Sequence, residues 1–230
     1  MKTLKLIAAI VLIAFSTSVN AQEKTEVRDV KGFTGVDVSE GIKVLLTYGD
    51  KEFVEVTADE DIIDRVVTEV NGTELDIYIK GNNWNGGKRK VVVKVTAIKI
   101  QSLDASSGSS IVTTNTIESE TLTTSVSSGA SIKAAVNAQK VSCDASSGAH
   151  ASLSGTTTMF RAEASSGSSI HADELKAKRV KADVSSGATI KCNAEDELIA
   201  EASSGGSVKY SGSPKMVDVD KSSGGSVRKN

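Results

Sequence analysis

The stretch SCDASSGAHASL (residues 142–153) contains a Ser-Ser-Gly unit that occurs seven times in the chain. Successive units are separated by 21, 19, 19, 20, 18 and 19 residues. Their glycines are Gly108, Gly129, Gly148, Gly167, Gly187, Gly205 and Gly224. A flexible linker would not keep such regular spacing, whereas a structural repeat requires it. We therefore interpret the unit as part of the architecture.

The residues that flank each unit alternate between apolar or small side chains and polar ones. In the stretch above, the apolar or small residues are Val141, Cys143 and Ala145 before the glycine and Ala151 after it. Alternation with a period of two is typical of a strand that buries one side. Each unit therefore predicts a short strand, a tight corner at a glycine that can adopt a positive φ, and a second short strand.

Repeats of 18 to 21 residues with this pattern predict an all-β fold, a single-chain parallel β-helix (β-solenoid) with one turn per repeat. Stacked turns are about 4.8 Å apart, so seven turns would form a rod of about 34 Å. We assign residues 101–230 to this solenoid and residues 22–100 to an N-terminal β-rich cap region of the same domain. Differences in repeat length fall between the second strand and the next unit, where solenoids accept insertions.

The cap region has its own strand and turn signals. Alternating runs predict strands in GVDVS, GIKVLLTY and EFVEVTA (residues 35–58). The pair Asn71 and Gly72 stands between two further alternating runs and predicts a β-hairpin. The stretch ADEDIIDRV predicts one helical turn, with Asp59 as its N-cap.

The first 21 residues have the pattern of a secretory signal peptide. Two lysines precede the apolar run LIAAIVLIAF, and small residues at 19 and 21 fit cleavage before Gln22. The apolar run is too short for a spanning helix, so we do not expect an integral membrane protein. Export places the chain in the periplasm, at the cell surface or outside the cell. After cleavage its net charge is −4, which argues against a nucleic-acid partner.

Two features together resemble a known family. One is FTGVDVSEGIKVLLTYGDKEFVEVTADEDIIDRVVTEVNGTELDIYIKG (residues 33–81), and the other is the run of repeats that includes SSGSSI and SSGASIKA. They resemble the secreted bacterial proteins, common in Bacteroidetes, described as "putative auto-transporter adhesin, head GIN domain". The resemblance implies a right-handed β-helix, export and adhesion, and no established catalytic residues. We expect the word auto-transporter not to apply literally, because no transporter barrel is apparent after the repeats.

One outward position carries acids in six of the seven repeats. It lies two residues before the first serine, and Ser125 is its neutral member. The acids are Asp104, Asp144, Glu163, Asp183, Glu201 and Asp220. Stacked carboxylates repel one another, so solvent and salt, the neighbouring Arg161 and Lys181, or bound Ca²⁺ must compensate. The row is thus a solvated face, a cation site or a recognition face.

A second outward position, six residues after the first serine, is rich in basic side chains. Its members are Val112, Lys133, Ser152, His171, Lys191, Lys209 and Arg228. This row is either a solvated face or a contact for an anionic glycan or surface. Lys221, Arg228 and Lys229 at the end of the last repeat are expected to discourage edge-to-edge stacking of rods.

Isolated reactive or aromatic residues give weaker signals. His150 and His171 occupy different repeat positions and need not be neighbours, so we predict no metal site. Cys143 and Cys192 have inward parity and lie two turns apart, too far for a disulfide. Trp84, in a Gly/Asn-rich turn, is either packed on the cap or a sugar-stacking tip.

Catalysis is not expected. Seven Ser-Ser-Gly units cannot all act as nucleophiles with only two histidines as bases. Glycan-cleaving enzymes need paired carboxylates in a groove, and the short turns here leave no long loops to build one. The sequence predicts a non-catalytic envelope module without a cofactor, monomeric or dimeric, that binds a surface glycan or protein as an adhesin. A structural assembly protein is the alternative, and a glycan-active enzyme is less favoured.

Overall fold

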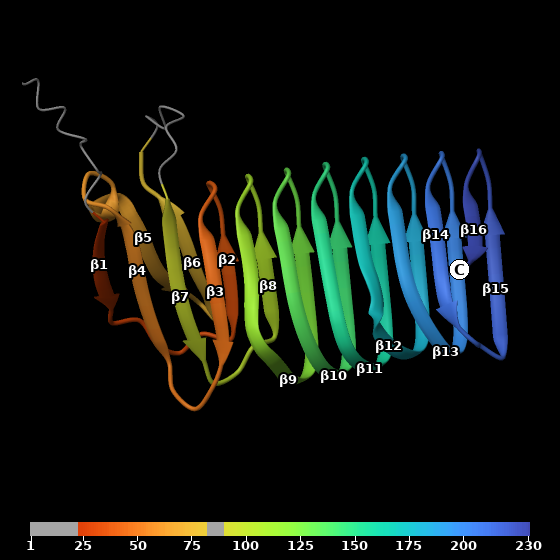
Figure 1. The fold of residues 1–230 in the computed structure, drawn as a ribbon, viewed down its shortest axis with the longest axis horizontal. Coiled ribbons are helices and arrows are strands. Elements are labelled where there is room, and N and C mark those ends of the chain that lie inside the picture. Colours follow the sequence, from red (N-terminus) through yellow and green to blue (C-terminus); the bar gives the residue numbers. More distant parts are fainter. Residues whose placement is uncertain (1–22, 82–89) are drawn as a thin grey trace, which may run out of the picture.

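The structure is a computed structural model that describes residues 23–81 and 90–230. It is almost entirely β, with one short 3-10 turn, and the predicted β-solenoid is confirmed (Figure 1). The elements are β1 (Glu23–Arg28), β2 (Gly35–Val38), β3 (Lys43–Tyr48), β4 (Phe53–Asp59), η1 (Ile63–Arg65), β5 (Val66–Asn71), β6 (Glu74–Ile79), β7 (Val91–Ala97), β8 (Ser102–Ala105), β9 (Ser110–Val126), β10 (Ser131–Ala145), β11 (His150–Ala164), β12 (Ser169–Val184), β13 (Thr189–Ala202), β14 (Ser207–Gly212), β15 (Met216–Lys221) and β16 (Ser226–Lys229).

The chain coils into two layers. Each of β9 to β13 leaves one Ser-Ser-Gly corner, bends at the opposite edge and returns to the next corner, so one continuous strand makes almost a whole turn. The two short strands expected per repeat are therefore joined through the second bend. We call one layer the leaving layer, because its repeat segments lead away from the corners. It holds β1, β4, β7, β3, the first parts of β9 to β13, β14 and β16. The entering layer holds β5, β6, β2, β8, the last parts of β9 to β13, and β15.

Each corner is a type I′ turn. In the middle repeat Ser147 and Gly148 both have positive φ, of 53° and 69°, and the Ala149 N–H donates to the Ser146 carbonyl at 3.1 Å. The Gly148 N–H donates along the stack to the Ser166 carbonyl, also at 3.1 Å. A Cβ at Gly148 would meet nothing within 4 Å, so the glycine is needed for its φ and not for space. The left-handed serine before it was not predicted.

An eighth corner lies in the region assigned to the cap. Glu40 and Gly41 have φ of 60° and 73°, and the Gly41 N–H donates to the Ser107 carbonyl at 3.1 Å. The strands on either side, β2 and β3, pair in parallel with β8 and β9. β6 and β7 extend the two layers by one further parallel strand each. The parallel stack therefore starts before the first Ser-Ser-Gly unit.

Antiparallel strands close the N-terminal end. β4 pairs with β7, β1 pairs with β4, and β5 pairs with β6 through the predicted hairpin, in which Gly72 has a φ of 64°. The predicted helical turn is present as η1, but the expected side-chain cap from Asp59 is wrong. The backbone carbonyl of Asp59 accepts the Ile62 N–H instead, at 3.0 Å, and no side-chain cap forms. Ile62 and Ile63 are buried and cover this end of the core.

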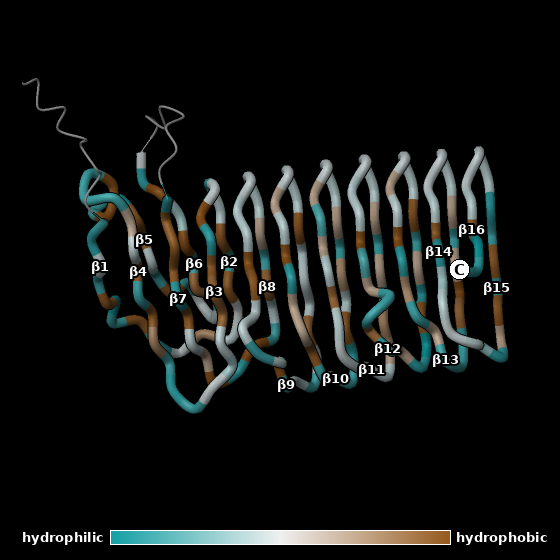
Figure 2. Tube along the Cα trace, viewed as in Figure 1, coloured by the Kyte–Doolittle hydropathy of each residue, from teal (hydrophilic) through white to brown (hydrophobic). Residues whose placement is uncertain are grey.

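The core consists of stacked small and branched side chains between the layers. Ile132, Ala151 and Ile170 lie in register after successive corners, and all are fully buried. Figure 2 shows hydrophobic segments along the strands. It also shows that the corners at the upper edge have near-neutral hydropathy. The inward parity of Cys143 and Cys192 is confirmed: both are buried free thiols, and burial raises the pKa of each to about 12.

The corner geometry predicts opposite responses at adjacent residues. Gly148→Ala places a Cβ on a left-handed residue, so the free energy of unfolding should fall by about 1–2 kcal/mol. Ser147→Gly relieves the same strain, and this gain offsets the greater freedom of the unfolded chain. The free energy of unfolding should therefore change by no more than about 0.5 kcal/mol. Urea denaturation of both variants checks this. Equal losses for the two would contradict the type I′ assignment.

Candidate binding surface

The predicted acids form one row on the outer side of the entering layer. Four successive register pairs join them from Asp144 onward: Asp144 with Glu163, Glu163 with Asp183, Asp183 with Glu201, and Glu201 with Asp220. Asp104 is separated from Asp144 by the neutral Ser125. The structure thus brings all six predicted acids together in one line along the solenoid axis.

The row continues across the N-terminal turns. Asp37 pairs with Asp104, Asp76 pairs with Asp37, and Glu69 pairs with Asp76 across the hairpin. The sequence reading missed these three acids. Asp37 stands two residues before Ser39, as the other acids do before their serines, so alignment of the eighth corner would have found it. We call the whole line the acidic row: Glu69, Asp76, Asp37, Asp104, Ser125, Asp144, Glu163, Asp183, Glu201 and Asp220.

Burial and repulsion raise proton affinity at several positions of the acidic row. Burial, followed by repulsion from Asp37 and Glu74, raises the pKa of Asp104 to about 6, although a hydrogen bond with Ser125 opposes the shift. Burial and the charges of Asp76 and Glu74 raise the pKa of Asp37. Burial and Glu163 also raise the pKa of Asp144. These pKa shifts reflect the partial burial of the three carboxylates and, second, the nearness of other acids.

Basic side chains offset part of this charge. The Arg161 guanidinium donates to the Glu163 carboxylate, and it lowers the pKa of Asp144 against the other effects there. The Lys181 Nζ lies 4.0 Å from a Glu201 oxygen, and both side chains are about half exposed. Such exposed pairs contribute little to stability. A shallow groove of about 340 Å³ still runs over the carboxylates of Asp144, Glu163 and Asp183.

Beside the N-terminal part of the row, a carboxylate reaches across a glycine. The Ser102 hydroxyl donates to Glu74 Oε1 at 2.7 Å, and both residues pair with Gly35, which lies between them. A Cβ at Gly35 would lie 1.9 Å from Glu74 Oε2. This oxygen is buried and has no hydrogen-bond partner. A side chain at position 35 would therefore displace the Glu74 carboxylate and the Ser102 hydroxyl.

The basic row is found on the outer side of the leaving layer. Register pairs connect Lys133, Ser152, His171, Lys191, Lys209 and Arg228 in that order. The ring centroids of His150 and His171 lie 4.8 Å apart in an edge-on contact, a proximity that their sequence positions had left open. A ring nitrogen of His150 lies 2.8 Å from the Ser169 hydroxyl. Burial, together with the charges of Lys191 and His150, lowers the pKa of His171.

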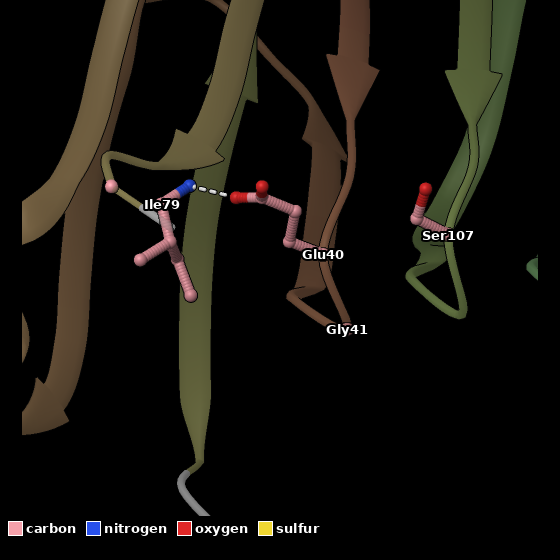
Figure 3. Close-up of a pocket in the computed structure, with 5 residues that line it drawn as sticks. Glu40, Gly41, Ile79 and Ser107 are labelled. Carbon is pink, nitrogen blue, oxygen red and sulfur yellow. Dashed lines mark hydrogen bonds between the residues drawn. The ribbon is translucent and has the colours of Figure 1, made fainter. Parts of the chain in front are cut away.

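A separate, more apolar cavity of about 330 Å³ lies beside the eighth corner. Ile79, Gly81 and Ser107 contribute to its lining, with Glu40 and Gly41 from the corner itself. Figure 3 shows the Glu40 carboxylate accepting a hydrogen bond from the Ile79 backbone N–H. Glu40 stands where the other corners have serine. Trp84 and the predicted signal peptide lie outside the described residues.

Within residues 23–81 and 90–230, no group of three or more His, Cys, Asp or Glu side chains is arranged to hold a metal ion. The same residues include no helix that is long and apolar enough to cross a bilayer. Fold and surface together define a two-layered β-solenoid with an acidic row on one layer and a basic row on the other.

The chain belongs to the family described as "Putative auto-transporter adhesin, head GIN domain", which matches residues 32–214 and confirms the resemblance noted in the sequence. No curated protein matches the chain.

Solved structures share the fold at low sequence identity. The crystal structure of a putative adhesin from Bacteroides fragilis NCTC 9343 is similar with a TM-score of 0.83 and 19% identity, over 92% of this chain and 98% of that one. A putative adhesin from Parabacteroides merdae ATCC 43184 has a TM-score of 0.74 and 16% identity, over 92% and 97% of the two chains. A putative lipid binding protein from Parabacteroides distasonis ATCC 8503 has a TM-score of 0.69 and 18% identity, over 92% and 98%. At these identities the likeness concerns the fold alone.

The raised pKa of Asp104 predicts a pH-dependent stability. Its folded pKa of about 6 exceeds the ordinary value, so the folded chain binds more protons than the unfolded chain, and stability should fall as pH rises from about 4 to about 7. Asp104→Asn should flatten this part of the profile and be more stable than the unaltered protein at pH 7. Ser125→Ala, which removes the opposing hydrogen bond, should move the fall to higher pH. Thermal unfolding at a series of pH values measures both, and an unchanged Asp104→Asn profile would contradict the assignment.

The even spacing of the acidic row predicts a weak response to Ca²⁺. Calcium prefers six to eight oxygen ligands gathered around one point, whereas these carboxylates are spread along an open groove. We expect millimolar Ca²⁺ to leave the melting temperature nearly unchanged in differential scanning fluorimetry. A rise of several degrees that disappears in the variant D144N/E163Q/D183N would establish a cation site instead.

Proposed function

We propose that this protein is an exported, non-catalytic binding module of the cell envelope that attaches to a surface glycan or protein through its entering layer. The acidic row carries the proposal. It presents nine carboxylates and one serine in strand register on a rigid sheet. Ionised carboxylates accept hydrogen bonds from hydroxyl and amino groups, which glycans and lysine-rich proteins supply in quantity.

Membership in the adhesin-like family supports binding and surface location. The geometry of the acidic row supports binding over catalysis. Glycoside hydrolysis needs one carboxylate that donates a proton and a second that acts on the opposite side of a bound sugar. The carboxylates here lie side by side on adjacent strands along one face, and not on opposite sides of an enclosed site. Affinity would be distributed over several turns, as is typical of repeat proteins with extended binding surfaces.

A glycan array with matched variants tests this function. The unaltered protein should bind a defined subset of glycans, and D144N/E163Q/D183N should lose most of the signal. The control K133Q/K191Q/K209Q changes three charges on the leaving layer and should retain it. Mass spectrometry of the bound glycan should find no cleavage product. Equal loss in both triple variants would contradict recognition by the acidic row, and turnover would show an enzyme.

A further inference from the structure

The C-terminal end of the solenoid leaves apolar side chains uncovered. Val217 occupies an inward position that is fully buried at Leu198 in the preceding turn, yet 46% of its surface is exposed. Met216 beside it is 60% exposed, and Val219 and Val227 are only partly buried. The N-terminal end differs because antiparallel strands and the buried η1 segment cover it.

The backbone at this end also has an open edge. Among the described residues, β15 pairs only with β13, and β16 pairs only with β14 (Figure 1). The Ser226 N–H donates to the Gly206 carbonyl of the preceding turn at 2.9 Å. Because successive backbone groups of a strand point to opposite sides, the N–H and carbonyl of Val227 point away from β14. Such unpaired edges readily accept another strand.

We propose that a second copy of this chain binds the C-terminal edge and forms a two-fold dimer, in which each protomer's β15 pairs with β16 of the other. Head-to-tail growth would require the covered N-terminal end, so a closed pair is the available arrangement. Two two-fold axes would pair these edges in antiparallel fashion. One is parallel to the strands and places β15 beside β16 of the second copy. The other is perpendicular to the layers and places each strand beside its own equivalent.

Charge distinguishes the two axes. The outward side chains of β15 include Asp218 and Asp220, and Arg228 is the charged outward residue of β16. All three side chains are exposed. The axis parallel to the strands sets these carboxylates beside the arginine of the second copy, twice per dimer. The perpendicular axis would set like charges together, which is destabilising in a sheet. Complementarity therefore selects the first axis.

The lysines at this edge restrict the contact without removing it. Lys221 and Lys229 stand at inward positions, where charges oppose edge-to-edge pairing. Their long side chains can extend past the apolar residues to solvent.

In the selected dimer the corner edges of both copies lie on the same side. Rotation about an axis parallel to the strands does not move a corner to the opposite end of its strands. The two entering layers then face opposite ways, so the acidic rows point in opposite directions.

Sedimentation velocity and light scattering across a wide concentration range test the dimer. The unaltered full chain should be in monomer–dimer equilibrium. R228D should raise the dimer dissociation constant by at least about tenfold, because two contacts change per dimer. D218R/D220R should do the same, and combining it with R228D should restore association. The control K133D reverses a charge on the same basic row five turns away and should leave the equilibrium unchanged.

The results of these association measurements do not depend on the result of the glycan array. A monomer at every concentration would overturn the proposal, as would a dimer that K133D weakens as much as R228D does. A dimer that R228D leaves intact would favour the perpendicular axis and refute the β15–β16 pairing. The altered side chains are exposed, and thermal melting of each variant confirms that it is folded.

Discussion

The hydrogen bond from each corner glycine N–H to the serine carbonyl of the next turn is the interaction on which the rest of the structure depends. It recurs at 3.1–3.2 Å from Gly41 to Gly205 and fixes every corner at the same height. The glycine N–H and the serine carbonyl point along the solenoid axis because both central residues of each corner are left-handed, as a type I′ turn requires. Once the corners are aligned, the alternation of side chains along each strand places equivalent residues of successive turns in rows.

Because the corners cannot slip, irregularities collect elsewhere along each turn. The register between β9 and β10 shifts after Lys133, and that between β11 and β12 shifts after Ser152. The register between β12 and β13 shifts after Ala172 and again after Ala177. All four shifts lie before the last part of the strand, which enters the next corner. They absorb repeat lengths of 18 to 21 residues without moving the segment that leads into the next corner. The entering layer is consequently the more regular of the two, and it carries the acidic row.

The repeat spacing was sufficient to predict the solenoid, its inward residues and six members of the acidic row. It could not reveal Glu69, Asp76 and Asp37, because those acids join the row through the hairpin and the Ser-Glu-Gly corner, which are remote from the repeats in sequence. The His150–His171 contact was also hidden. Neighbouring turns bring different repeat positions within reach of large side chains, and a row-by-row alignment does not show diagonal contacts. The division at residue 100 and the roles of the signal peptide and Trp84 stay predictions.

The acidic row is costly to the fold that displays it. Register that aligns the core also aligns the carboxylates, and where they are partly buried their pKa values rise, as at Asp37, Asp104 and Asp144. The fold does not need an acid at this position, since Ser125 occupies it in one turn while its neighbours Thr124 and Val126 stay buried. Repulsion between like charges would favour neutral side chains throughout, if stability alone determined the choice. The energetic penalty at Asp37, Asp104 and Asp144 supports the proposed role of these carboxylates at the surface of a partner.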